Sequence, residues 1–125
     1  MRASGRNELD APALDRDHLR RQCLDDRNLA AELLALFRVE ARALAAELAG
    51  DRLSPSARAD IAHRLRGSAL AVGAFAVARA AEAVEACGRD ATRAGAVPAV
   101  EMSQAITNLG EAIARAAAEI DRLKR

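Results

Sequence analysis

Two long stretches of the chain repeat apolar residues at the spacing of an amphipathic helix, which constrains the fold more than any other feature. The first runs from about Asp26 to Ala49 and stops at Gly50, a residue type common at helix ends. The second follows Pro98, which suits the first turn of a helix, and continues to about Leu123. The repeating positions are Leu29, Leu33, Leu36, Phe37, Leu44 and Leu48 in the first stretch, and Val100 or Met102, Ile106, Leu109, Ile113, Ala116 or Ala117, Ile120 and Leu123 in the second. Both stretches are therefore predicted to be long helices with one apolar face.

A shorter helix is predicted ahead of the first long one. Asp15 or Asp17 can cap it, it carries Leu19 and Cys23, and the acidic pair at 25–26 interrupts it. The residues before it are polar and include a glycine and a proline, so 1–12 are predicted to form a flexible tail. At 125 residues the chain is long enough for one domain, which is expected to occupy 13–125.

Two more helices are predicted between the long stretches. Ser54 as an N-cap and Pro55 at the first helical position predict a helix that runs to about Val72. Gly73 then marks either a tight turn or a close helix crossing. A fourth helix is expected from Ala74 to about Arg89. One side of this helix carries a stripe of Val77, Ala81, Val84 and Gly88, and the opposite side carries Phe75, Arg79 and Glu82.

The composition favours helices throughout. Alanine is abundant, aromatic residues make up 2% of the chain, and β-branched residues are few. Long helices joined by short connections pack as antiparallel neighbours. The predicted fold is therefore an all-α, up-down-up-down four-helix bundle with a short extra N-terminal helix.

The charge pattern excludes several classes of partner. The 19 basic and 18 acidic residues are interspersed, so no surface for nucleic acid or for an anionic membrane is expected. The longest apolar run is too short to span a bilayer, and the first residues lack the apolar core of a secretory signal. The protein is expected to be cytoplasmic. Cys23 and Cys87 have no partners at metal-ligand spacing and are predicted to be buried, reduced thiols without a function.

His63 is the candidate functional residue. On a helix, Ile61 and Leu65 form an apolar stripe one turn apart, and His63 lies about 200° around the axis from both. Its imidazole is therefore predicted to face away from the core. Arg66, Gly67 and Leu70 follow on the same side of the helix.

The neighbours of His63 indicate phosphoryl chemistry. Gly67 costs about 1 kcal/mol relative to alanine inside a helix, so its presence suggests that something approaches closely there. Arg66 adds a permanent positive charge one turn from the ring, where it can stabilise a phosphoryl group in transfer. A neutral imidazole is a competent nucleophile near pH 7. We expect His63 to accept a phosphoryl group.

The pattern His63-x-Leu-Arg-Gly-Ser-Ala, followed by Gly73-Ala and Val84-Glu85, resembles the histidine-containing phosphotransfer (HPt) domain family, and the likeness runs from about Leu14 to the C-terminus. By resemblance, His63 is the phospho-acceptor, Arg66 stands where the family usually has lysine, and Gly67 gives the partner clearance. Arginine keeps the positive charge of lysine but presents it as a planar fork.

The resemblance implies a carrier in a two-component phosphorelay, with response-regulator receiver domains and a hybrid histidine kinase as partners. The carrier would take the phosphoryl group from one receiver aspartate and pass it to another. It would bind no cofactor itself, because Mg²⁺ would come with the receiver, and it would have no kinase activity. A monomer is expected. The alternative is a non-catalytic helical module that docks receivers or other helices without phosphorylation.

Candidate partner-binding residues surround His63. Arg64 and Arg79 either dock the partner or are ordinary solvated charges. Leu70 and Phe75 either form an apolar patch near His63, or Phe75 is partly buried against a neighbouring helix.

Three further polar residues are assigned no role in the chemistry. Ser68 lacks an accompanying base, Glu85 is given no catalytic function, and His18 is predicted to be a surface residue of the first helix. Asp60 and His63 have the spacing of a metal-binding pair, but the additional carboxylates of a bundle metal site are missing, so no metal is expected.

Overall fold

A computed structural model describes residues 12–50, 52–95 and 99–123 of the chain, and all regular elements in these ranges are helices. The short helix α1 spans Arg16–Gln22, and α2 spans Arg27–Ala49. They are followed by α3 at Pro55–Val72, α4 at Phe75–Ala94 and α5 at Ala99–Leu123. The all-α prediction is confirmed.

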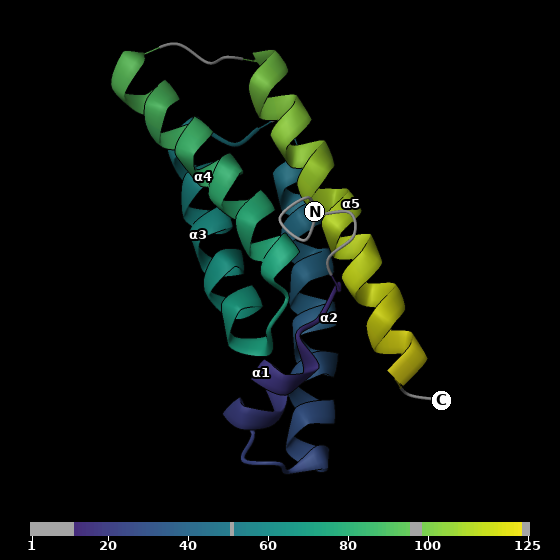
Figure 1. Cartoon of the computed structure of the whole chain (residues 1–125). Coiled ribbons are helices and arrows are strands. Elements are labelled where there is room, and N and C mark those ends of the chain that lie inside the picture. The colour runs from purple at the N-terminus through teal and green to yellow at the C-terminus, as the bar shows by residue number, and fades with distance from the viewer. Residues whose placement is uncertain (1–11, 51, 96–98, 124–125) are drawn as a thin grey trace, which may run out of the picture.

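The four longer helices pack side by side. α3 lies against α2 and α4, and α5 lies against α4 and α2, while α1 packs on α3 and α2 at one end (Figure 1). The largest fully buried side chains come from α2 to α5 and from the end of α1: Leu48, Leu65, Leu109, Ile120, Val77, Val84 and Cys23. This arrangement is consistent with the predicted bundle of four helices and a short N-terminal helix.

Local capping explains where the first three helices begin. The side chain of Asp15 accepts a hydrogen bond from the His18 backbone N–H at 3.0 Å, and Asp26 caps α2 in the same way. Ser54 caps α3, with Pro55 at its first position. Such caps satisfy backbone donors that have no partner within the helix. The predicted starts of α1 and α3 are therefore confirmed, and Asp15 is the cap of α1.

Gly73 forms the turn between α3 and α4. Its φ of 81° lies in the left-handed region, where glycine is favoured over residues with a Cβ. Its carbonyl also accepts a hydrogen bond from the Asp15 N–H at 2.9 Å. Of the two expected roles, the tight turn is the observed one, and the turn is also tied to the cap of α1.

Gly88 marks the close approach of α4 to α3. A Cβ built at this position would lie 2.5 Å from the Pro55 carbonyl oxygen and 3.0 Å from the Cβ of Ala59. Both are closer than side chains normally approach. The stripe predicted on α4 is confirmed, because all four of its residues are buried, and its glycine lets the two helices come together.

Several sequence-based details are wrong. α4 ends at Ala94 and not near Arg89, because its buried face continues to Ala91 and Gly95 supplies the left-handed cap. In α2, Leu29 and Leu36 are 40% and 67% exposed, although the pattern placed them on the apolar face, and Leu34 is buried in their place.

The remaining alternatives can be assigned for the described residues. Met102 and not Val100 faces the core of α5. Cys23 is buried as predicted, but Cys87 is only half-buried. The expectations for the tail at 1–11 and for Pro98 lie outside the described residues. Among the helices described, none is long and apolar enough to cross a membrane.

Candidate functional site

His63 lies near the middle of α3 with its imidazole toward solvent. Ile61 and Leu65 on the same helix are buried, with exposed fractions of 8% and 0%, whereas the His63 side chain is 64% exposed. The predicted outward orientation of His63 is confirmed. The ring is therefore accessible to a large partner.

Glu85 of α4 holds the His63 ring. The distance from His63 Nδ1 to Glu85 Oε2 is 2.9 Å, and the Glu85 side chain is only 16% exposed. An ionised carboxylate only accepts hydrogen bonds, so Nδ1 donates and carries the ring proton. In a neutral imidazole the lone pair is then on Nε2, the nitrogen that Glu85 does not occupy.

Two arginines lie next to the same carboxylate. Arg66 Nη1 is 3.4 Å from Glu85 Oε1. Arg89 Nη2 is 3.9 Å from Glu85 Oε2 and 2.9 Å from Asp60 Oδ1, so it bridges an acid on α4 and an acid on α3. Two permanently charged guanidinium groups therefore lie beside the carboxylate that binds His63, and Glu85 and Asp60 hold them in place.

Gly67 leaves open space one turn beyond His63. A Cβ built at this position would meet no atom of another residue within 4 Å, and the residue is exposed. The glycine is therefore not required for packing within this chain, in contrast to Gly88. This fits the clearance for a partner that the sequence predicts.

The residues predicted to bind the partner fall into two groups. Arg64 and Arg79 are exposed, on α3 and α4 respectively, and Leu70 is 41% exposed. Phe75 is half-buried, and its ring meets the His18 ring edge-on, with centroids 5.1 Å apart. Of the two alternatives for Phe75, partial burial against a neighbouring helix is the observed one.

The expectation for His18 needs correction. Its ring is half-buried, and Nε2 lies 2.9 Å from the Leu70 carbonyl oxygen, so His18 donates a hydrogen bond to the end of α3. A surface position was expected because Leu70 and Phe75, which contact the His18 ring, are more than 50 positions away in the sequence. His18 fixes α1 at the turn between α3 and α4.

A sequence model of the Hpt domain matches residues 32–124, which is most of the chain and includes the whole site. The chain belongs to the Hpt domain family. Hpt domains are phosphocarriers, not kinases, and they act in two-component relays with receiver domains and histidine kinases. No curated protein and no solved structure matches the chain.

In this Hpt domain, sequence reasoning missed Glu85 and Arg89. Glu85 was noted as part of the family pattern but given no catalytic function, and Arg89 was not singled out. Both face α3 at positions that flank the buried stripe of α4, four residues apart. Only the register between α3 and α4 brings them to His63, and a single sequence carries no direct signal of that register.

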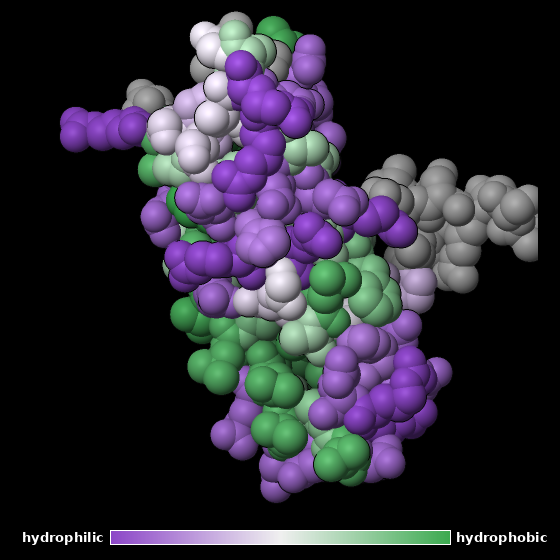
Figure 2. All heavy atoms as spheres, turned by 90° about the vertical axis from the view of Figure 1, so that its left-hand side faces the viewer, coloured by the Kyte–Doolittle hydropathy of each residue, from purple (hydrophilic) through white to green (hydrophobic). Residues whose placement is uncertain are grey.

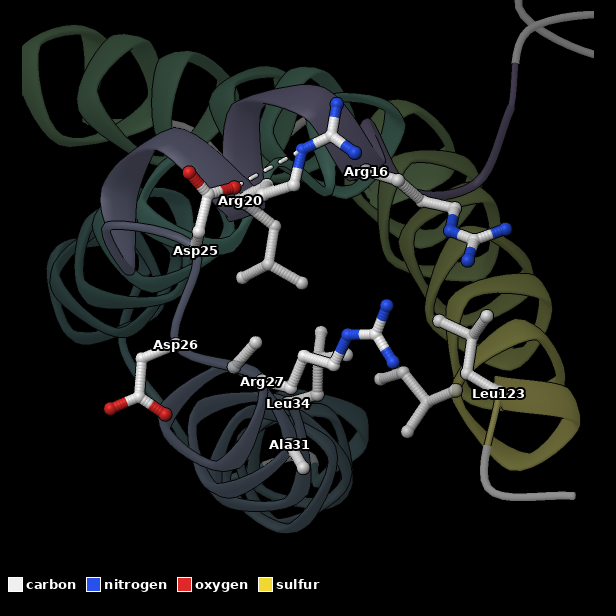
Figure 3. Close-up of a pocket in the computed structure, with 11 residues that line it drawn as sticks. Arg16, Arg20, Asp25, Asp26, Arg27, Ala31, Leu34 and Leu123 are labelled. Atoms are coloured by element: carbon white, nitrogen blue, oxygen red, sulfur yellow. Dashed lines mark ion pairs between the residues drawn. The ribbon is translucent and has the colours of Figure 1, made fainter.

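Other features of the Hpt domain lie apart from His63. A groove of about 730 Å³ is lined by α1, the start of α2 and the end of α5, and contains none of the site residues (Figure 3). Within the described part of the chain, no three His, Cys, Asp or Glu side chains gather as a metal site. Asp60, the potential metal partner of His63, is instead paired with Arg89.

Proposed function

We propose that His63 carries the phosphoryl group of this Hpt domain, accepting it from the aspartyl-phosphate of one receiver domain and passing it to the aspartate of another. The observation that carries this proposal is the exposed imidazole whose Nδ1 is held by Glu85. The exposure of the ring and the contact between Glu85 and Nδ1 both favour Nε2 as the nucleophile.

The transfer balances without a cofactor bound to this chain. The Nε2 lone pair attacks phosphorus, a P–N bond forms, and the P–O bond to the receiver aspartate breaks, leaving its carboxylate with the electron pair. The imidazole becomes positively charged and keeps its Nδ1 proton, which Glu85 stabilises. The onward transfer is the reverse step on a second aspartate. Mg²⁺ is proposed to come with the receiver.

Arg66 is proposed to stabilise the phosphoryl group during transfer. Phosphoryl transfer spreads negative charge over three oxygens, and a nearby guanidinium lowers the energy of that charge. Arg66 is 36% exposed and makes a 3.4 Å contact with Glu85, so it is held near His63 without being buried. Its planar fork can bind two phosphoryl oxygens at once.

The partner is proposed to dock on the face formed by α3 and α4. Figure 2 views the molecule from the side of α3 and α4 and shows hydrophilic side chains over its upper half and hydrophobic side chains over much of its lower half. Leu70 is exposed near the end of α3, and Arg64 and Arg79 are exposed on α3 and α4 respectively. Acidic receiver sites would be attracted by these arginines. We propose a cytoplasmic monomer built as an up-down-up-down bundle.

The test is intact mass after incubation with phosphoramidate, a small phosphoryl donor. The chain has two histidines, so His63→Gln and His18→Gln form a matched pair. We expect one acid-labile phosphoryl group on the wild type and on His18→Gln, and none on His63→Gln. A phosphoryl group that persists in His63→Gln would refute the assignment. If the wild type takes up no phosphoryl group yet binds receivers, the non-catalytic docking module is the better description.

A further inference from the structure

Arg89 lies beside the carboxylate that binds His63 and is also held by a second acid. Its Nη2 is 2.9 Å from Asp60 Oδ1 and 3.9 Å from Glu85 Oε2, the same oxygen that binds His63 Nδ1. Asp60 is one helical turn before His63, so both side chains project from the same region of α3. Arg89 and His63 therefore both lie next to the carboxylate of Glu85.

We propose that Asp60 binds Arg89 while His63 is unphosphorylated, and that Arg89 moves to the phosphoryl group once His63 carries it. This inference rests on the proposed function of His63. It assigns Arg89 as a second phosphoryl-binding cation beside Arg66. Asp60 acts on the reaction only through Arg89 and is a positioning residue.

The charges around His63 explain why the arginine would move. Before phosphorylation, Arg66 and Arg89 face Asp60 and Glu85, so the formal charges of these four residues cancel. A phosphoryl group carries about −1.5 to −2 charge near pH 7, and the imidazolium that bears it carries +1, so phosphorylation adds a net charge of about −1. The site then has an excess of negative charge, which favours moving the Arg89 guanidinium from Asp60 to the phosphoryl group.

The pair between Arg89 and Asp60 is suited to exchange. The two side chains are 44% and 67% exposed, and ion pairs at such exposure contribute little to stability. A guanidinium bound to phosphoryl oxygens forms two parallel charge-assisted hydrogen bonds, which are stronger. Asp60 therefore competes with the phosphoryl group for Arg89, which keeps the group transferable.

The competition can be measured on the phosphorylated protein. We would load His63 with phosphoramidate, confirm loading by intact mass, and follow the ³¹P resonance against pH to find the midpoint at which the phosphoryl group takes up a proton. A nearby cation favours the deprotonated group and lowers this midpoint. We expect Asp60→Asn to weaken proton binding about two- to fivefold, the range of an exposed ion pair, and Arg89→Gln to strengthen it.

The double variant separates Arg89 from the charge of Asp60 itself. If Asp60 acts through Arg89, the variant with both substitutions titrates like Arg89→Gln alone. Asp90→Asn is the control, because Asp90 pairs with Arg93 on the same helix and not with Arg89, and it should titrate like the wild type.

Each other outcome overturns a stated claim. Additive effects of the two substitutions would show that Asp60 acts by its own charge, and an unchanged midpoint in Arg89→Gln would show that Arg89 does not reach the phosphoryl group. Either result overturns the inference while leaving His63 as the carrier. Failure of the wild type to load would instead count against the proposed function.

Discussion

Gly67→Ala should stabilise the protein and impair its transfer reaction. The substituted methyl group would meet no atom of another residue within 4 Å, so it introduces no clash within the chain. Alanine is favoured over glycine inside a helix by about 0.5 to 1 kcal/mol. For a domain of this size, that corresponds to a rise of about 2 to 5 °C in the unfolding midpoint.

In the proposed reaction, the same methyl group would occupy the space through which a receiver approaches His63. A misplacement of about 1 Å can slow a reaction about a hundredfold. We therefore expect transfer from a phosphorylated receiver to slow by about ten- to a hundredfold. Loading by phosphoramidate should change much less, because this donor is small. Intact mass against time measures both reactions.

Gly110→Ala is the matched control. Gly110 is an exposed glycine inside α5, and a Cβ there also meets nothing within 4 Å. It should raise the unfolding midpoint as much as Gly67→Ala but leave both reactions unchanged. Equal rates of transfer from the receiver in the two variants would refute the need for clearance at Gly67. A lowered midpoint in Gly67→Ala would refute the packing argument.

Three further predictions test other parts of the structure. Gly88→Ala should destabilise the fold by about 1 to 3 kcal/mol in urea unfolding, since its methyl group clashes with α3, and unchanged stability would contradict the close helix contact. Glu85→Ala should slow phosphoramidate loading about tenfold, as expected for a lost hydrogen bond to a charged group. Glu85→Gln should recover most of the rate, because its amide oxygen still accepts a hydrogen bond from His63 Nδ1. Equal loading rates in the two variants would exclude a positioning role for Glu85. Burial raises the pKa of the Cys87 thiol, and the negative charges of Glu101 and Asp90 raise it further. Less thiolate is then present at a given pH, so Cys87 should react with iodoacetamide at pH 8.5 more slowly than a free cysteine does. A faster reaction would contradict this prediction.

The sequence was most informative where the cause of a structural feature is local. Both limits of α3 follow from neighbouring residues, because Ser54 and Pro55 define its start and Gly73 its end. The orientation of His63 follows from two buried neighbours on its own helix. These features depend on capping and helical periodicity, which a single segment contains in full.

Features that depend on contacts between helices were not predictable in the same way. Glu85 meets His63 only because α3 and α4 pack in one register, with Gly88 allowing the close approach. The exposure of Leu36 was missed because periodicity gives the apolar side of a helix but not how far its neighbours cover it.

The attachment of α1 has a consequence for how the protein folds and opens. Hydrogen bonds from Asp15 and His18 reach the end of α3 and the turn that joins it to α4, and both span more than 50 residues of sequence. Closing such a long loop costs chain entropy, whereas α3 and α4 meet across a two-residue connection. The hairpin of α3 and α4 can therefore form early, and α1 docks late. In the folded protein, the amide hydrogens of α1 should accordingly exchange with solvent before those of the helix that carries His63.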